Sequence, residues 1–179
     1  MKLNWKRLSL VLAFILFLAF GFWYTQETTI QDHAPELDPA LCQSITARYF
    51  VNQKGDRDGE RKEVTIQPGD PAFDQLVGLV RNQKFSKSLS GLLPLGSRSV
   101  RLEEGDFQWE LHFNFNTPIT TPDGNGHAGP LLQVHNWYGT LKLTFAHLDE
   151  IWRDASTGNK TNWSVQVLEA IQSAEGTGT

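Results

Sequence analysis

Hydrophobic and polar positions along this chain change their spacing several times, and each spacing predicts a different element. The first apolar stretch is unbroken over residues 8–24, and Ser9 carries its only aliphatic hydroxyl group. A helix that packs on a soluble domain has a polar stripe along its exposed side, and this stretch has none. We therefore predict a transmembrane signal-anchor helix over residues 8–24.

The charges around this stretch predict its orientation. Lys2, Lys6 and Arg7 precede it, and the first acidic residue, Glu27, follows it. Basic residues before an apolar segment are typical of a chain whose amino terminus stays in the cytoplasm. We therefore expect residues 1–7 to be a short basic cytoplasmic end, the protein to be a single-pass protein of the cell membrane, and the C-terminal domain to be extracytoplasmic.

A cleaved signal peptide is the alternative interpretation of the same segment. Ala19, Phe20 and Gly21 fit the small-x-small pattern of a cleavage site. Cleavage there would release a secreted domain and leave no membrane contact. Both interpretations place the rest of the chain outside the cytoplasm.

The polar stretch that follows has neither helical nor strand periodicity. Residues 25–43 contain Pro35 and Pro39 and predict an extracytoplasmic stalk. We expect a globular domain over residues 44–174 and a disordered tail over residues 175–179.

Alternation of apolar and polar residues within the domain predicts strands, and a spacing of three to four predicts helices. The clearest strand begins at Phe107, where five large apolar residues occupy every second position. Asp70 and Pro71 form a typical helix start, with a capping side chain followed by proline. The predicted order is strand, strand, helix, strand, strand, helix, over residues 44–51, 63–67, 71–82, 107–115, 131–145 and 162–173. This ββαββα order predicts an α+β fold, an antiparallel sheet with two helices packed on one face.

Charge and cysteine content narrow the class of protein. Residues 25–179 carry 13 basic and 20 acidic side chains, a formal charge of −7. This charge argues against nucleic acid as a partner. The single cysteine, Cys42, cannot form an internal disulfide, which is unusual for a small eukaryotic secreted domain and favours a bacterial envelope protein.

Histidines and one glutamate on the predicted strands are the first candidates for chemistry. Glu110 and His112 occupy the polar side of the strongest strand, and His135 lies on the next strand. In a suitable register the three side chains would be neighbours and could form a two-histidine, one-carboxylate metal site. The alternative is that the histidines are solvated on the polar face of a sheet.

A glycine-rich loop is the second candidate. Residues 123–127 begin like a calcium loop, but the twelfth position is Val134 where such a loop has glutamate. A tight turn that presents His127 to a ligand explains the composition better. Trp137 and Tyr138 cannot both be buried on one side of a regular strand, so one of them could be exposed at a binding surface. The alternative is that one packs under the second helix and the other under the segment of residues 85–98.

No serine lies in a nucleophile elbow, and Cys42 lies in the predicted stalk. We therefore expect a noncatalytic binding or interaction domain with no cofactor, whose contact residues include Glu110, His112, His127, His135 and Tyr138. The expected partner is an envelope protein, and the sequence does not define the oligomeric state. A metal-dependent envelope hydrolase that uses Glu110, His112 and His135 is the alternative.

Overall fold

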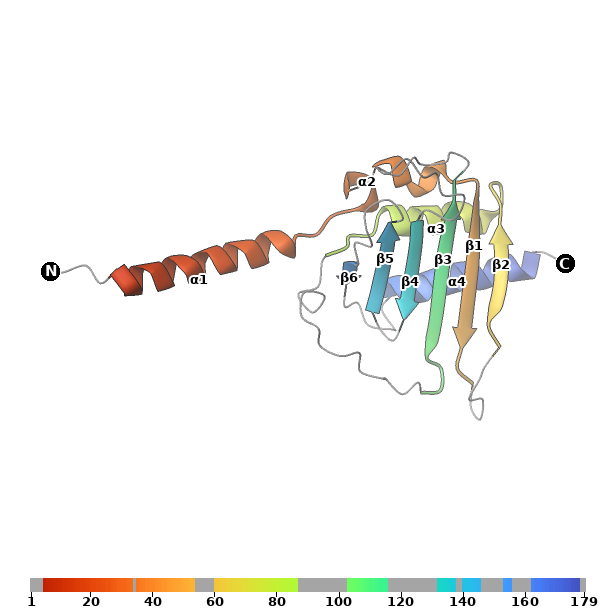
Figure 1. The fold of residues 1–179 in the computed structure, drawn as a ribbon. Helices are drawn as coiled ribbons and strands as arrows, with labels where there is room; N and C mark the ends of the chain where they lie inside the picture. The colour runs from red at the N-terminus through yellow and green to blue at the C-terminus, as the bar shows by residue number, and fades with distance from the viewer. Residues whose placement is uncertain are drawn as a thin grey trace, which may run out of the picture.

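The structure is a computed structural model of the full chain. It describes residues 5–33, 35–53, 60–86, 103–115, 132–137, 140–145, 153–155 and 162–177. The fold is mixed α+β with an antiparallel sheet, which confirms the predicted fold class. The N-terminal helix projects away from the sheet, and the helices α3 and α4 lie against one face of it (Figure 1).

Helix α1 covers Trp5–Tyr24, which includes the whole apolar stretch. Large apolar side chains along it are exposed, among them Phe14 at 62% and Phe22 at 73%. Among the described residues, no helix has both the length and the apolar character needed to cross a membrane. That finding gives the transmembrane prediction for residues 8–24 no support.

The segment predicted as a free stalk packs on the domain. It contains the helical turns α2 (Ile30–His33), η1 (Pro35–Leu37) and η2 (Pro39–Leu41). Ile30 and Leu37 are part of the hydrophobic core. Thr28 pairs with Phe85 through two backbone hydrogen bonds of 2.8 Å. Ile30 and Leu37 are isolated apolar residues in a polar segment, so no periodic pattern in the sequence marks their packing.

The sheet has the strand order β2-β1-β3-β4-β5-β6, and every neighbouring pair is antiparallel. Its strands are β1 (Ser44–Val51), β2 (Lys62–Ile66), β3 (Phe107–Asn114), β4 (Leu132–Trp137), β5 (Thr140–Phe145) and β6 (Arg153–Ala155). The strand segment predicted over residues 131–145, in which Gly139 could mark a bulge or a break, is two paired strands, β4 and β5. The short strand β6 was not predicted, because three residues are too few to show alternation.

Helix α3 (Pro71–Arg81) begins as predicted. The Asp70 side chain accepts a hydrogen bond from the Ala72 backbone N–H at 2.8 Å, and Pro71 takes the first helical position. Helix α4 (Asn162–Thr177) continues past the predicted end of the helix and through most of the segment expected to be a tail. Its Glu175 side chain accepts hydrogen bonds from Tyr49 and Lys62, which explains why this end of the helix is held on the sheet.

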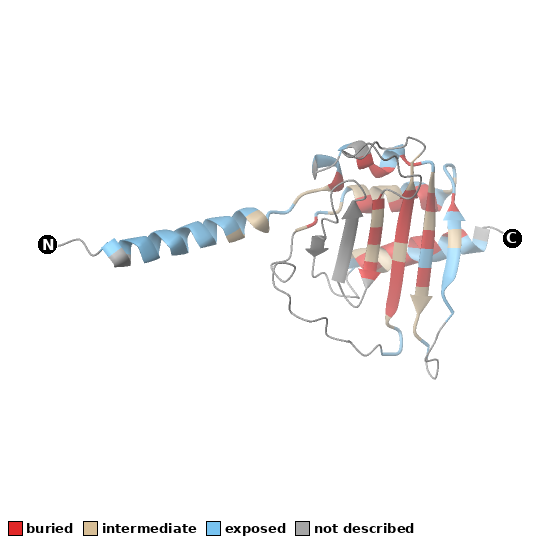
Figure 2. Ribbon diagram, viewed as in Figure 1, coloured by how far each residue is buried: buried red, intermediate tan, exposed pale blue. Residues whose placement is uncertain are grey.

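The hydrophobic core lies between the sheet and the two helices. Alternate residues of β1 are buried, and β3 is buried along most of its length (Figure 2). Trp109 and Leu111 of β3 are buried in it, as the alternation predicts. Leu76 of α3 and Ile171 of α4 face them across the layer. One face of the sheet therefore packs against the helices. The other face, here called the outer face, carries the polar positions.

Candidate functional site

Strand register brings the predicted histidines and glutamate together on the outer face. Glu110 of β3 is directly opposite His135 of β4, and His112 is opposite Gln133. The rings of His112 and His135 are 6.3 Å apart between centroids. The two histidines are therefore diagonal neighbours with the glutamate between them.

Glu110 is the shared partner in this cluster. His112 donates a short hydrogen bond from Nε2 to Glu110 Oε1. His135 Nδ1 lies 3.8 Å from the same oxygen. The hydrogen bond from His112 holds the pKa of Glu110 below its usual value, against the opposing effect of burial, with a smaller contribution from His135.

The cluster is shielded from solvent rather than solvated. The side chains of Glu110 and His135 are each 16% exposed and that of His112 is 11% exposed. The expectation of two solvated histidines on a polar sheet face is therefore wrong for both. A carboxylate in such surroundings needs a partner, and His112 provides it.

The described residues include no group of three or more histidine, cysteine, aspartate or glutamate side chains that could hold a metal ion. Glu110, His112 and His135 are close together, but one carboxylate oxygen is already the acceptor of the His112 hydrogen bond. In this arrangement the cluster is a hydrogen-bonded acid–base group rather than an open set of ligands. His127 and Tyr138 lie outside the described residues, as does the loop of residues 123–127.

The same register produces a row of polar positions, most of them charged, across the sheet. Glu110 lies opposite Arg48 on one side and His135 on the other. Arg48 Nε in turn donates to Glu63 Oε2 of β2 at 2.6 Å. The row, from β2 to β6, consists of Glu63, Arg48, Glu110, His135, Lys142 and Asp154. Opposite charges on neighbouring strands stabilise a sheet and mark this line as its most polar one.

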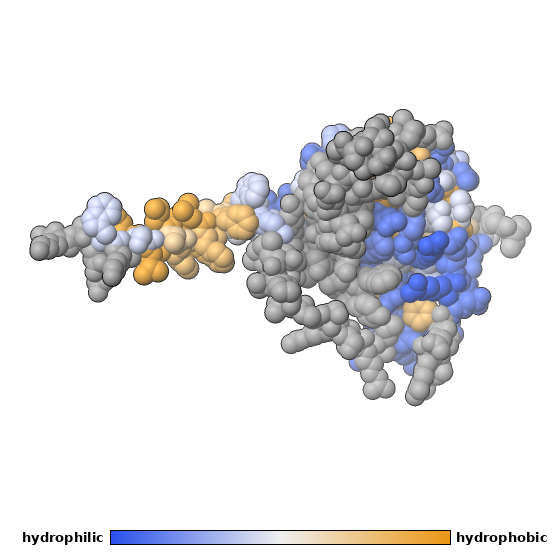
Figure 3. All heavy atoms as spheres, viewed as in Figure 1, coloured by the Kyte–Doolittle hydropathy of each residue, from blue (hydrophilic) through white to orange (hydrophobic). Residues whose placement is uncertain are grey.

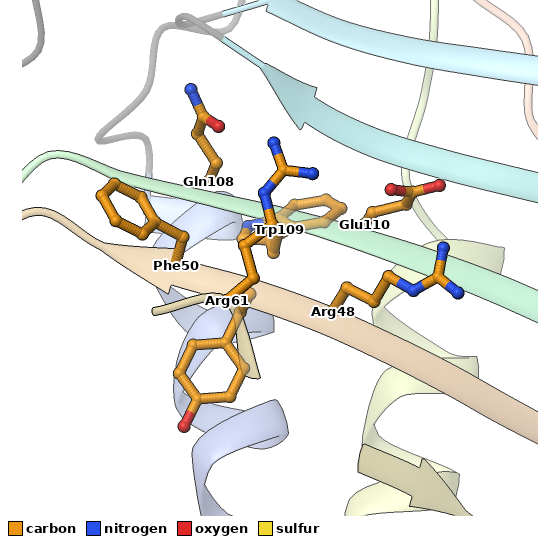
Figure 4. Close-up of a pocket in the computed structure, with 7 residues that line it drawn as sticks. Arg48, Phe50, Arg61, Gln108, Trp109 and Glu110 are labelled. Atoms are coloured by element: carbon orange, nitrogen blue, oxygen red, sulfur yellow. The ribbon is translucent and has the colours of Figure 1, made fainter. Parts of the chain in front are cut away.

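A pocket opens on the outer face beside this row (Figure 4). Arg48 and Phe50 of β1 and Gln108 and Glu110 of β3 line it, and Arg61 reaches it from the start of β2. Phe50 is directly opposite Gln108 in the register. Tyr49 and Trp109 also line the pocket, which therefore combines two arginines, one glutamine, one glutamate and three aromatic residues.

A buried polar network on the inner face was missed by sequence reasoning. Trp109 Nε1 donates to the backbone oxygen and to Oγ of Ser164, both at 3.1 Å. The Asn136 side-chain amide donates to the same Ser164 Oγ. A single asparagine or serine in a strand or helix carries no signal in sequence, because its role depends on which element packs over it. The network fixes the start of α4 on β3 and β4, the strands that hold the cluster.

Two further side chains, those of Cys42 and Trp163, lie in the packed part of the domain. Cys42 is buried, and burial raises the pKa of its thiol from 9.0 to about 12, which makes it a poor nucleophile. Trp163 contacts Trp109 and Phe85 edge to face and donates from Nε1 to the Leu79 backbone oxygen at 2.9 Å.

No protein-family model matches this chain, and no curated protein or solved structure matches it significantly.

Proposed function

We propose that this protein is a noncatalytic binding domain held at a membrane by α1, and that the outer face of its sheet is the contact surface. The domain lies on the extracytoplasmic side, as in a bacterial envelope protein. The observation that carries the proposal is the exposure of large apolar side chains on all sides of α1 while the rest of the chain folds around its own core.

Helix α1 presents a continuous apolar surface (Figure 3). Its exposed side chains include Leu10, Phe17 and Phe22, at 70%, 69% and 73%. Apolar patches of this kind on a protein surface mark contact with other proteins or with lipid. Lipid is the better match, because the apolar side chains surround the helix rather than forming one stripe.

Its length and ends also fit lipid. The 17 residues of the apolar stretch rise about 26 Å as a helix, close to a hydrocarbon layer of about 30 Å. Trp5, Trp23 and Tyr24 stand at its ends, where aromatic side chains favour the boundary between lipid and water. The basic residues before it favour a cytoplasmic amino terminus.

The outer face supports the binding role by its chemistry. It carries both signs of charge in one row, and Phe50 beside that row is only partly buried. Arginine and aromatic side chains are enriched where proteins bind partners. The opposite face is covered by α3 and α4 (Figure 1), whereas outer-face positions on β1 and β2, among them Arg48 and Thr65, are exposed.

Membrane attachment is tested by fractionation of cells that express the full chain. We expect the protein in carbonate-washed membranes, and a variant with Phe14→Arg and Phe17→Arg in the soluble fraction. Leu41→Arg is the matched control, because Leu41 is 65% exposed on the folded domain, and it should stay with the membrane. Full-length protein in the soluble fraction would contradict attachment.

The contact surface is tested by placing a photo-crosslinking residue at Thr65 or at Gln75. Thr65 is exposed on β2 with its side chain on the outer face, and Gln75 is exposed on α3. We expect a discrete crosslinked product from Thr65 in native membranes and none from Gln75. The same products from both positions, or products from Gln75 alone, would refute the outer face as the contact surface.

A metal-dependent envelope hydrolase is a second candidate, favoured by the convergence of Glu110, His112 and His135 on one side of the sheet. It requires the His112 hydrogen bond to Glu110 to open and admit a metal ion. Elemental analysis of protein purified without chelators tests this candidate. Stoichiometric zinc, iron or copper that is lost in the His112→Gln variant would support it, and metal-free protein would reject it.

A further inference from the structure

We propose that an open groove along α3, beside Trp163 at the start of α4, binds a neutral saccharide. The groove has a volume of about 390 Å³, which lies in the range of about 300–1,000 Å³ that is typical of small-molecule sites. It belongs to the layer of helices and not to the outer face of the sheet. The inference therefore goes beyond the proposed function and does not depend on it.

Two neighbouring rows of residues on α3 line the groove. Residues four apart in a helix lie above one another on the same side. Asp74, Gly78 and Asn82 form the first row, which spans about 12 Å along the helix axis. The second row consists of Gln75, Leu79 and Gln83. The groove is therefore elongated, and its middle is open at Gly78.

The glycine at position 78 costs the helix stability and has no packing role in the described part of the chain. Gly78 lies inside α3, where glycine is less favourable than alanine. A Cβ atom at this position would meet no atom within 4 Å, and the backbone of Gly78 is not left-handed. The missing side chain instead leaves a notch in which a ligand can approach the helix backbone closely.

Trp163 forms an aromatic wall of the groove. Its Nε1 donates to the Leu79 backbone oxygen at 2.9 Å, and its ring contacts Phe85 and Trp109 edge to face. These contacts hold the ring in one position, and it remains only partly buried where it lines the groove. Since the indole N–H is bonded inside the domain, the ring offers the groove its π surface. The C–H groups of a sugar ring carry partial positive charge and pack well on such a surface.

The polar side chains of the groove match hydroxyl groups. An amide, like a hydroxyl, both donates and accepts hydrogen bonds. The side chains of Gln75 and Asn82 form no hydrogen bond with another described residue, and Gln83 uses only its Nε2, for the Lys84 backbone oxygen at 3.1 Å. Asp74 is the one charged residue that lines the groove, so an anionic ligand is disfavoured. An amine would satisfy Asp74 alone, whereas hydroxyl groups match the carboxylate and the three amides.

The flat aromatic wall and the elongated shape also favour a kind of saccharide. A sugar ring whose substituents are all equatorial presents C–H groups on both faces, which suits stacking on Trp163. A β-linked chain of such rings is extended, as the groove is. The disaccharides cellobiose and N,N′-diacetylchitobiose have both properties and no net charge, and they are therefore the probes for this site.

The test is saturation-transfer difference NMR of each disaccharide with the full-length protein, in micelles of a detergent without a sugar headgroup. We expect saturable binding of at least one of the two. Gly78→Gln places a side chain in the notch and should weaken binding about 10-fold or more. Asn82→Ala removes one amide and should weaken binding about 5-fold.

Gly176→Gln is the matched control for Gly78→Gln. Gly176 is also in a helix, and a Cβ atom there would likewise meet no atom within 4 Å, but it does not line the groove. Both glutamine variants should melt at the same or a higher temperature than the original protein, because glutamine is the better helix former. Only Gly78→Gln should lose the saccharide, and a loss of binding together with unchanged or raised stability separates a ligand site from a structural effect.

Three results would overturn the proposal. They are no saturable binding of either disaccharide, equal binding by the original protein and Gly78→Gln, and an equal loss in Gly78→Gln and Gly176→Gln. If Gly78→Gln melts at a lower temperature, the exposed Asn82→Ala variant decides by the same criterion. The crosslinking comparison of Thr65 with Gln75 keeps its meaning, because a saccharide next to Gln75 gives no crosslink to a second protein.

Discussion

Removing the Ser164 hydroxyl should destabilise the domain more than removing the Ser173 hydroxyl on the same helix. Ser164 is 1% exposed, and its Oγ accepts hydrogen bonds from both Trp109 and Asn136. In Ser164→Ala the indole N–H keeps the Ser164 backbone oxygen at 3.1 Å as an acceptor. The Asn136 amide loses its bond to Oγ inside a packed layer.

The expected loss in the free energy of unfolding follows from the hydrogen bond that the Asn136 amide loses. A buried polar group that loses its partner costs about 1–3 kcal/mol. Alanine is the better helix former, by about 0.5 kcal/mol or less, which offsets a small part of that cost. We expect the free energy of unfolding to fall by about 1–2 kcal/mol. Urea unfolding of the full-length protein, followed by tryptophan fluorescence, measures the change.

Ser173→Ala is the matched control on the same helix. The Ser173 hydroxyl is exposed and donates to the Ala170 backbone oxygen at 2.8 Å within α4 itself. Its removal should change the free energy of unfolding by about 0.5 kcal/mol or less. If Ser164→Ala and Ser173→Ala have the same effect, the network does not hold α4 on β3 and β4, and the reasoning fails.

Two more predictions follow from the pKa shifts. Because His112 lowers the folded-state pKa of Glu110, the ionised carboxylate stabilises the fold above its unfolded pKa of about 4.3, and this contribution is lost as pH falls through the lower folded value. The difference in the free energy of unfolding between the original protein and Glu110→Gln, measured by urea unfolding, should therefore shrink as the pH falls below about 4.3. A difference that stays constant there would contradict the shift. The Cys42 thiol, with its pKa raised from 9.0 to about 12, should react with iodoacetamide at pH 8 roughly 1,000-fold more slowly than an unperturbed thiol, and urea should restore the fast rate; fast alkylation of the folded protein would show that Cys42 is accessible.

The sequence predicts the elements of this fold where periodicity is strong. The alternation over Phe107–Asn114 marks the central strand, and Asp70 with Pro71 marks the start of α3. It fails where single residues do the packing, as with Ile30 and Leu37 in the segment predicted as a stalk. A lone apolar residue in a polar segment has no period, so its burial becomes visible only when the surface that it covers is known.

Only part of the geometry of the candidate cluster could be predicted from the sequence. Parity along β3 places Glu110 and His112 on one side of the sheet, and this could be predicted from sequence. The register that sets Glu110 opposite His135 could not, because it depends on the pairing of β3 with β4. The burial of the cluster also lay beyond the sequence, since alternation defines which face a side chain points to and not how much of that face is covered.

Glu110 is part of both the histidine cluster and the pocket on the outer face, so substitutions at other residues are needed to distinguish the two. It accepts the hydrogen bond from His112 and it also lines the pocket beside Arg48. A substitution at Glu110 therefore changes the histidine cluster and the pocket together, and its effect on a ligand cannot be assigned to either. Gln108 stands four residues from His112 on β3, about 13 Å along the strand. A change in the pH dependence of stability in a His112 variant, without one in a Gln108 variant, would thus locate proton uptake in the cluster and not in the pocket.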